Sequence, residues 1–399
     1  MMCRMFIVVC CPLCFLSNDN LIRMFLFCYE CSLTRLLKKV WLQGISVFVQ
    51  YSGMVPIMKH IFINGKFLCQ QTTGVQRFAI EILKKIDNLN PKDISFTIVA
   101  PNKKYLVNDI SFKNISLVHI GGKPNYFWEQ ITLPIYCKKH KPDDLLNLCN
   151  VAPIISPGSC VIHDLAIIDA PKGSVFRKRL VYRIINRLNI KRYHLVFTVS
   201  FTMKKRIEEF YKIKDVVVVY NSANHILDVT EEKPKWDVPQ HFFFALSSMN
   251  PNKNFQAIIH LASKMSDSFF VIGGSRGKGF KKEKLVIPDN VLFTGYLKDS
   301  EILYLYKRCD AFLFPSFYEG FGIPPLEALL CGCKCVICNN IPVLREIYGS
   351  YVTFSDFSEK ISIKEKHPPI EELSRKFDWG RSANIILSNY CKSLGEERY

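Results

Sequence analysis

The chain has 399 residues, enough for two domains of ordinary size, each with its own hydrophobic core. Hydrophobic residues make up 49% and charged residues 22%, a balance that excludes an intrinsically disordered chain. The net charge of +18 predicts an anionic partner, which could be nucleic acid, anionic lipid or a phosphorylated substrate. No basic and aromatic recognition motif supports nucleic acid.

Residues 1–57 differ from the rest of the chain and form a hydrophobic, cysteine-rich N-terminal extension. Two cysteine pairs, Cys11-Pro-Leu-Cys14 and Cys28-Tyr-Glu-Cys31, have the spacing of a zinc ribbon. They lack the glycines and polar loops of a small zinc module, so we expect no metal there. The apolar runs fall short of the ~20 residues of a spanning helix. We expect translation to begin at Met58, where the sequence becomes typical of an α/β domain.

A Rossmann-like N-terminal domain is predicted for residues 58–222. It begins with a strand over His60–Asn64, a polar loop over Gly65–Gly74 and an amphipathic helix over Val75–Ile86. Gly74 would let a ligand approach the backbone, although an ordinary turn is the simpler explanation of the glycine taken alone. Further apolar strands are predicted at Ser95–Ala100, Ser116–Ile120, Asp144–Leu148, Val161–Asp164, Val196–Ser200 and Val216–Tyr220.

His163 and Asp164 close one of these apolar strands. Open α/β sheets bind their ligands at the carboxyl ends of the strands. His163 is therefore a candidate hydrogen-bond donor to a sugar hydroxyl or a phosphate oxygen. A hydrogen bond to nearby backbone would explain the histidine equally well.

A basic stretch from Lys172 to Arg206 contains eleven Lys and Arg residues and no acidic residue. Apolar residues alternate with the charges in the pattern of an amphipathic helix that lies against anionic lipid. A solvated helix whose apolar side packs on the core is the alternative. Because no acid balances the charge, we expect this surface to contact an anionic membrane.

A polar, proline-bearing linker is predicted for residues 223–240, and a second Rossmann-like domain for residues 241–376. Lys253 lies on the loop after the first strand of this domain, just ahead of a helix N-terminus. An ammonium group there would meet a diphosphate. The expected elements of the domain are strands at His241–Leu246, Phe269–Gly273, Val291–Phe293 and Ala311–Phe314, and helices from Phe255 and over Glu301–Lys307.

The clearest motif follows the strand Ala311–Phe314 and combines two glutamates with a glycine-rich loop and Pro324-Pro325. The prolines mark the first turn of a helix. The free backbone N–H groups at this helix N-terminus would face an anion, and they belong to Gly320, Phe321, Gly322 and Ile323. Glu319 and Glu327 would accept hydrogen bonds from hydroxyl groups. The motif therefore predicts a ligand that carries both phosphate and polyol groups, such as a nucleotide sugar.

Four cysteines follow this motif, at Cys331, Cys333, Cys335 and Cys338. Cys335 and Cys338 lie an odd number of residues apart in an apolar run, so in a strand their side chains would point to opposite faces. We therefore expect reduced core cysteines and no metal site.

The chain from Met58 to about Leu394 resembles a GT-B glycosyltransferase of the large retaining group called glycosyltransferase family four. The most specific element is the pair of Glu319 and Glu327 within the motif above. Supporting motifs occur in the expected order at Thr73–Arg77, Trp128–Gln130, His163–Asp164, Thr198–Ser200, Asn250–Asn254 and Phe293–Tyr296. The resemblance implies two Rossmann-like domains that face each other across a cleft, with a crossover helix in residues 377–399 that returns to the first domain.

The resemblance also implies roles for the matched residues. Glu319 would contact the donor sugar and its developing charge, and Lys253 would neutralise the leaving diphosphate with Asn254 beside it. Glu327 would bind the nucleotide ribose. Gly74 and His163 would line the cleft from the first domain. No metal or other cofactor is implied.

Two positions depart from the family pattern. Ser247 stands where glycine is common, and Asn252 stands where a basic residue is common. This leaves open how many cations hold the diphosphate, and Arg276 of the glycine-rich run that also contains Lys278 could substitute.

Together these features predict a retaining glycosyltransferase that moves a hexose, with mannose as the first candidate, from a nucleotide sugar to a glycan or lipid-linked glycan in surface polysaccharide biosynthesis. A non-catalytic GT-B subunit that binds a nucleotide sugar is the alternative. The basic first domain predicts a peripheral location on the inner face of the cytoplasmic membrane. The donor base, the linkage and the oligomeric state stay open.

Overall fold

The computed structural model describes residues 8–9, 47–48, 58–108, 110–170, 176–246, 250–274 and 286–395. The chain forms two compact units, Met1–Ile57 and Met58–Tyr399. In the first unit, β1 (Val8–Val9) pairs antiparallel with β2 (Val47–Phe48). The cysteines with zinc-ribbon spacing lie outside the described residues, so that prediction stays untested.

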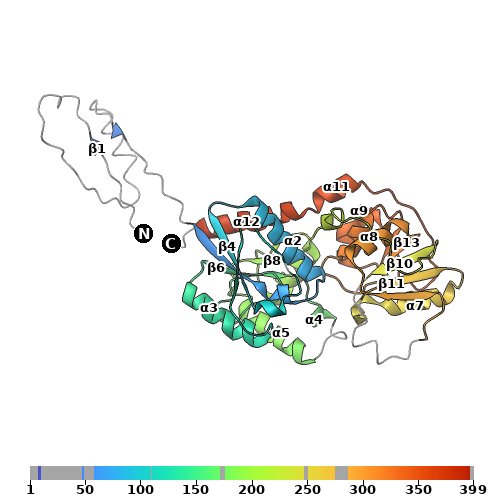
Figure 1. Ribbon diagram of the computed structural model, residues 1–399, viewed down its shortest axis with the longest axis horizontal. Helices are drawn as coiled ribbons and strands as arrows, with labels where there is room; N and C mark the ends of the chain where they lie inside the picture. The colour runs from blue at the N-terminus through green and yellow to red at the C-terminus, as the bar shows by residue number, and fades with distance from the viewer. Residues whose placement is uncertain are drawn as a thin grey trace, which may run out of the picture. The chain divides into compact units, whose positions relative to one another are not determined.

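The first domain of the larger unit is built on a parallel sheet of seven strands, in the spatial order β5-β4-β3-β6-β7-β8-β9 (Figure 1). The strands are β3 (Lys59–Asn64), β4 (Ile94–Ala100), β5 (Ser116–His119), β6 (Asp144–Asn147), β7 (Ser159–Ile162), β8 (Val196–Thr198) and β9 (Val217–Val218). The strand order reverses between β3 and β6, where Phe62 is in register with Leu145. Ligands of open parallel sheets bind beyond the carboxyl ends at such a reversal.

The helices of this domain follow the strands and cover the sheet. They are η1 (Gly65–Cys69), α2 (Gly74–Leu89), η2 (Lys103–Tyr105), η3 (Trp128–Thr132), α3 (Leu133–His140), α4 (Ala166–Asp169), α5 (Phe176–Asn189), α6 (Phe201–Tyr211) and η5 (Asn224–Ile226). The amphipathic pattern of α2 buries Phe78, Ile82 and Leu83 completely, because these residues recur at the spacing of one helix face.

The second domain repeats this architecture with a parallel sheet of six strands, in the order β12-β11-β10-β13-β14-β15. The strands are β10 (Phe242–Leu246), β11 (Phe269–Gly273), β12 (Val291–Gly295), β13 (Ala311–Phe314), β14 (Val336–Cys338) and β15 (Thr353–Phe354). The helices are η6 (Pro251–Lys253), α7 (Phe255–Lys264), α8 (Asp299–Arg308), α9 (Ile323–Leu330), α10 (Pro342–Tyr348), η8 (Gly349–Tyr351), α11 (Ile370–Lys376) and α12 (Trp379–Gly395). The order reverses between β10 and β13, so the prediction of two Rossmann-like domains is confirmed.

The last helix returns to the first domain, as predicted. In Figure 1, α12 lies alongside α2. The hydroxyl of Tyr390, on α12, donates to Oδ2 of the buried Asp144 at the start of β6 over 2.8 Å. Trp379 begins α12 and meets Phe78 of α2 edge-on, with 5.9 Å between the ring centroids. This helix therefore ties the end of the chain to the first domain.

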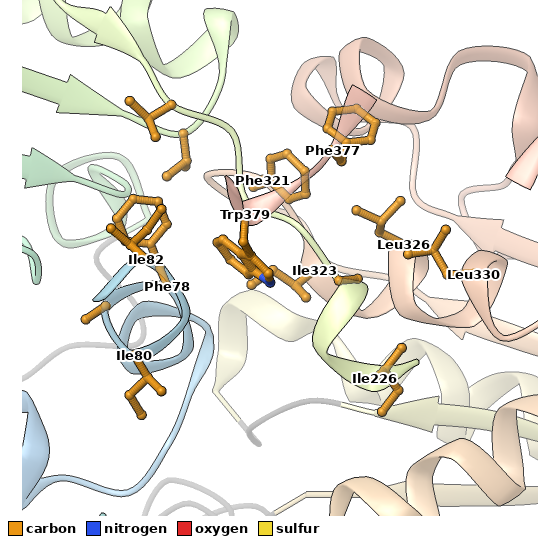
Figure 2. Close-up of a cluster of buried hydrophobic side chains, with 14 of the residues drawn as sticks. Phe78, Ile80, Ile82, Ile226, Phe321, Ile323, Leu326, Leu330, Phe377 and Trp379 are labelled. Carbon is orange, nitrogen blue, oxygen red and sulfur yellow. The ribbon is translucent and has the colours of Figure 1, made fainter. Parts of the chain in front are cut away.

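The largest hydrophobic cluster includes residues of both domains. Figure 2 shows Trp379 between Phe78 of α2 and Phe321 and Ile323 of the second domain. Phe377 packs edge-on against Phe321, with 5.5 Å between the ring centroids. This shared core holds the two domains against each other, because separating them would expose these aromatic side chains to water.

Two local predictions differ from the structure. Residues Gly65–Cys69 form a short helix instead of a loop, and Phe67 and Leu68 are buried in the core. The first part of the predicted linker is also buried, since His225 and Ile226 are 8% and 1% exposed. A polar or aperiodic stretch carries no local signal of such burial, because it arises from contacts with distant segments.

The prediction that these four cysteines lie in the core is confirmed. Cys331, Cys333, Cys335 and Cys338 are all buried thiols. Cys335 packs in one core cluster and Cys338 in another, as expected for side chains on opposite faces of a strand. Among the residues that the structure describes, no cluster of His, Cys, Asp and Glu could hold a metal ion.

Candidate functional site

A cavity of about 440 Å³ lies between the carboxyl edges of the two sheets. The segments that follow β3, β7, β10 and β13 line it, so it lies where both strand orders reverse. Nine of the ten predicted site residues line this cavity: Gly74, His163, Lys253, Glu319, Gly320, Phe321, Gly322, Ile323 and Glu327. Asn254 does not line it.

Two helix N-termini reach the cavity, one from each domain. Thr73 and Gly74 begin α2, and Gly322 and Ile323 begin α9. Each end presents backbone N–H groups and the positive end of a helix dipole, so the two ends together favour an anion. A Cβ atom at Gly74 would meet only Cδ1 of Ile323, at an ordinary 3.5 Å, so the space before Gly74 is open to a ligand.

Gly322 must be glycine for two reasons. Its φ of +90° lies in the left-handed region, which side chains disfavour. A Cβ atom there would also lie 2.8 Å from Cδ2 of Leu344, closer than real Cβ atoms approach other carbons. The glycine therefore turns the chain from the β13 loop into α9, which directs the first amides of this helix toward the cavity.

Lys253 and Glu319 form an ion pair, with Nζ 2.6 Å from Oε1. Lys253 ends the short helix η6 after β10, and Glu319 lies in the loop between β13 and α9, so the strand reversal brings the two residues together. Their side chains are 23% and 10% exposed, which leaves them accessible from the cavity. A cation and a carboxylate thus stand side by side at the α9 N-terminus.

Asn254 supports the Lys253 loop. It has a left-handed φ of 53°, and its Nδ2 donates to the carbonyl oxygen of Pro315 over 3.2 Å. The N–H of Phe317 donates to the carbonyl oxygen of Asn252 over 2.9 Å. These contacts join the loop after β10 to the loop after β13, so Asn254 aligns Lys253 with Glu319 without facing the ligand space.

Glu327 has two partners that the sequence did not indicate. Tyr306 of α8 donates to Oε2 over 3.0 Å, and Nε2 of His225 lies 3.1 Å from Oε1, an ion-pair distance without hydrogen-bond geometry. Burial acts to raise the pKa of Glu327, but His225, the charge of Arg77 and the Tyr306 hydroxyl together lower it. The carboxylate is therefore ionised and oriented at the wall of the cavity.

His163 differs from its predicted role as a donor. Its Nε2 lies 2.8 Å from the carbonyl oxygen of Leu148, which can only accept, so Nε2 carries the proton. Burial lowers the pKa of His163 to about 4, so the ring is neutral at pH 7 and Nδ1 is an acceptor. The predicted alternative, a histidine bonded to nearby backbone, is what the structure contains. In any hydrogen bond between Nδ1 and a ligand, a ligand hydroxyl would therefore be the donor.

The buried neutral state of His163 predicts a pH dependence of stability. The unfolded imidazole has a pKa near 6.5 and the folded one a pKa of about 4, so the unfolded chain binds more protons between these values. The contribution of His163 to the free energy of unfolding is fully present above pH 6.5, and it decreases by about 3 kcal/mol as the pH falls to 4. Urea unfolding at several pH values should show a flatter acid limb for His163→Asn, and an unchanged limb for His367→Asn at an exposed position. Identical slopes in wild type and His163→Asn would contradict this assignment.

Ion pairs and caps connect the domains around the cavity. Arg77 of α2 binds both carboxylate oxygens of Asp299 at the start of α8, at 2.9 and 2.6 Å, and both residues line the cavity. Glu346 of α10 accepts from the N–H groups of Phe201 and Thr202 at the start of α6, over 2.8 and 2.6 Å. Charged hydrogen bonds of this kind are stronger than neutral ones, so they add to the shared core in holding the domains together.

Sequence reasoning missed His225, Tyr306 and Asp299. His225 falls in the predicted linker, Tyr306 lies in the helix predicted over Glu301–Lys307, and Asp299 lies just ahead of those predicted bounds. A hydrophobic run shows which face of an element is buried, but it does not show which distant residue will lie opposite. Ser247, Arg276 and Lys278 lie outside the described residues, so the proposed substitute cation stays a prediction. In the part of the chain that the structure describes, no helix is long and apolar enough to cross a membrane.

Comparison with known proteins relates the chain to sugar-transferring enzymes. Residues 228–378 match the family model described as glycosyl transferases group 1. The chain is 28% identical over 229 residues to the O-antigen chain mannosyltransferase RfbU of Salmonella typhimurium, a match that covers 55% of this chain and 63% of that protein. It is 25% identical over 272 residues to the serotype-specific mannosyltransferase WbdA of Escherichia coli, covering 59% of this chain and 33% of that protein. The matches thus span less than two thirds of these relatives' length.

Solved structures share the fold. Sucrose-phosphate synthase from Thermosynechococcus elongatus superposes with a TM-score of 0.64 at 12% identity and covers 85% of this chain and 100% of its own. HepE from Anabaena, solved with UDP and glucose, superposes with a TM-score of 0.58 at 18% identity and the same coverage. At these identities the similarity establishes the architecture of two facing α/β domains.

Proposed function

We propose that this chain, which has the GT-B fold and whose residues 228–378 match the family model described as glycosyl transferases group 1, transfers a hexose from a nucleotide sugar. The proposal rests on one observation above all. Lys253, Glu319 and the N-termini of α2 and α9 converge on a single cavity. Amides and an ammonium group suit a diphosphate, whereas carboxylates suit sugar hydroxyls, and a nucleotide sugar contains both.

The proposed chemistry needs only these groups. As the anomeric bond breaks, negative charge develops on the leaving diphosphate, where the α9 amides and Lys253 stabilise it more than in the ground state. Glu319 faces the sugar, whose ring carbon gains positive charge. Glu327, oriented by Tyr306, accepts from the ribose hydroxyls. We propose retention of the anomeric configuration and no metal ion, as for the family that the motif resembles.

Mannose is the proposed sugar and surface polysaccharide the proposed product. The relatives RfbU and WbdA are named as mannosyltransferases, the first of them for the O-antigen chain. The acceptor would then be a glycan or a lipid-linked glycan. The matches cover only part of the length of these relatives, so the sugar, the acceptor and the product are proposals for this protein.

A screen of nucleotide sugars tests the proposal. A bound donor raises the unfolding temperature by mass action, so one member of a panel that includes GDP-mannose and UDP-glucose should stabilise the protein. The same sugar should then be hydrolysed slowly or transferred to acceptor lipid. Stabilisation without any turnover would favour the non-catalytic GT-B subunit, and a panel without any stabilisation would contradict both functions.

We also propose a membrane-facing surface on the first domain. Six exposed apolar side chains lie on or next to η3, α3 and α5 and on the loop between β6 and β7: Phe127, Ile131, Ile135, Ile155, Ile184 and Leu188. Exposed Lys and Arg residues flank them at Lys138, Lys139, Arg183, Arg187, Lys191 and Arg192. Apolar side chains beside positive charges suit the interface of an anionic bilayer.

Hydrogen bonds make this surface continuous. Gln130 of η3 accepts from the N–H of Ile154 over 2.9 Å, and Arg192 donates to the carbonyl oxygen of Ile154 over 2.8 Å. Asn189 at the end of α5 donates to the carbonyl oxygen of Pro153 over 3.0 Å. The loop that carries Ile155 therefore joins η3 to α5, and Figure 1 shows α3 and α5 on the same side of the sheet.

Removal of two apolar side chains should weaken lipid binding. The double variant Ile131→Ser and Ile135→Ser should sediment about tenfold less with vesicles containing phosphatidylglycerol, because each lost side chain contributes more than 1 kcal/mol of burial. A matched control places the same number of serines on the second domain at the exposed Phe269 and Val286. Equal sedimentation of the two double variants would contradict the proposed membrane-facing surface. Wild-type protein that binds neutral vesicles as strongly as anionic ones would contradict it as well.

A further inference from the structure

The residues on both sides of Glu319 are held by the first domain. By sequence the loop that carries Glu319 belongs to the second domain, where it joins β13 to α9. The hydroxyl of Tyr318 nevertheless accepts from the N–H of Leu165 and donates to Oδ2 of Asp169, each over 3.1 Å. On the other side, the carbonyl oxygen of Gly320 accepts from Oγ of Ser200 over 2.8 Å. The Glu319 loop is therefore fixed by its neighbours to the opposite wall of the cleft.

The first domain contains a formed socket for the Tyr318 hydroxyl. Arg206 of α6 binds Asp169 through both oxygens, at 3.0 Å from Nε to Oδ2 and 2.5 Å from a terminal nitrogen to Oδ1. Because both residues belong to the first domain, this pair does not depend on Tyr318. The Leu165 N–H and the Asp169 carboxylate supply one donor and one acceptor, which matches what a phenol hydroxyl needs.

Burial and nearby carboxylates keep the Tyr318 hydroxyl protonated, so that it can donate a hydrogen bond. Burial, with the charges of Asp164 and Asp169, raises the pKa of Tyr318 above its usual value. The hydroxyl thus stays protonated across the physiological range and can donate to Asp169. Arg206 holds this acceptor in place, so the socket has one preferred hydroxyl position.

Among the described residues, the partner of the Glu319 carboxylate is Lys253 of the second domain. The Glu319 carboxylate therefore pairs with a residue of the second domain, whereas its neighbours in the backbone are hydrogen-bonded to the first domain. A shift between the domains would move the Glu319 backbone relative to Lys253. An error of about 1 Å in the position of a reacting group can cost about a hundredfold in rate.

We propose that Tyr318 is a positioning residue, which uses the socket of Leu165, Asp169 and Arg206 to place Glu319 against the donor when the domains are together. This inference rests on the proposed sugar transfer. Donor binding depends on groups of the second domain, chiefly Lys253 and the α9 amides. The Tyr318 hydroxyl therefore acts on turnover and leaves donor affinity unchanged.

Tyr318→Phe tests the proposal, because phenylalanine keeps the ring and removes only the hydroxyl. We expect kcat to fall about 10- to 100-fold, with KM for the donor within about threefold and an unchanged unfolding temperature. Tyr351→Phe removes a hydroxyl from the same domain outside the cavity and should change neither constant. A wild-type kcat in Tyr318→Phe, or equal losses in kcat, donor affinity and stability, would overturn the positioning role.

Two further measurements separate this inference from the proposed function. Asp169→Ala and Tyr318→Phe should be non-additive, because either change removes the same contact. With UDP or GDP bound, amide hydrogen exchange in the 315–322 loop should be faster in Tyr318→Phe than in wild type, and this measurement does not require turnover. An inactive wild type would contradict the transfer reaction, whereas unchanged exchange in this loop would overturn the positioning role alone.

Discussion

Replacement of Glu319 by alanine should leave the protein folded and lower sugar transfer by about 100- to 1,000-fold. The carboxylate lines the cavity near the α9 N-terminus, where we propose that the anomeric carbon of a bound donor gains positive charge. Loss of a preorganised charge that acts mainly in the transition state typically costs this much. Single-turnover transfer of radiolabelled sugar from the donor identified by the screen would measure the loss.

The ion pair with Lys253 sharpens this prediction. In Glu319→Ala the ammonium group loses its partner at 2.6 Å and becomes free for the diphosphate. Nucleotide diphosphate should therefore bind at least as tightly to the variant as to wild type, while kcat falls. Glu359→Ala, on the exposed surface of the same domain, serves as the control. Full turnover in Glu319→Ala would refute the proposed role, and weaker nucleotide binding would mean that the residue supports the fold of the site.

The sequence predicted the framework of this site because its signals are local. Ala311–Phe314 is a short apolar run, and it forms β13 with the same bounds. Gly322 and the two prolines mark the turn into α9, which begins at Ile323. In a doubly wound sheet, residues after neighbouring strands must meet at one edge. Lys253 after β10 and Glu319 after β13 could therefore be placed together before their distance was known.

The contacts that orient the site could not be predicted in this way. His225 lies in a polar stretch without periodicity, yet it is buried against Glu327 more than 100 residues away. The predicted donor role of His163 failed because the fold places the Leu148 carbonyl beside Nε2. Such pairings depend on how whole elements pack, and a single sequence carries no signal for them. Asn254 was predicted from its place in a motif, but it does not line the cavity and instead donates to the carbonyl oxygen of Pro315.

The residues proposed to bind the donor differ from those that hold the two domains together. Most of the groups proposed to hold the donor, Lys253, Glu327 and the α9 amides, come from the second domain, and the α2 N-terminus adds to them from the first. The groups that locate them against the first domain are Tyr318, Gly320, Asp299 and Glu346. A change in the second set should alter turnover and domain arrangement before it alters nucleotide affinity, which gives the two sets different experimental signatures.

Gly320→Ala should have the second largest effect, by forcing the domains apart. A Cβ atom at Gly320 would lie 1.9 Å from the carbonyl oxygen of His163 and 3.4 Å from Cβ of Asp164. The first contact is with backbone of the opposite domain, so no side-chain rotation can relieve it. Each domain keeps its own sheet and core in this variant, and the least costly relief is a shift at the interface. We expect a loss of at least about 100-fold in kcat.

Three measurements distinguish this opening from misfolding in Gly320→Ala. Circular dichroism should match wild type, nucleotide should still raise the unfolding temperature, and the radius of gyration should increase. Ser200→Ala removes the hydrogen bond to Gly320 without adding an atom at the interface, so it should lower kcat by less than about tenfold, in keeping with one neutral hydrogen bond. If Gly320→Ala kept a wild-type radius and full turnover, the close approach of Gly320 to His163 could not belong to the active arrangement. A large loss in Gly320→Ala with a small one in Ser200→Ala would show that steric fit at this point, more than hydrogen bonding, sets the distance between the two walls of the cavity.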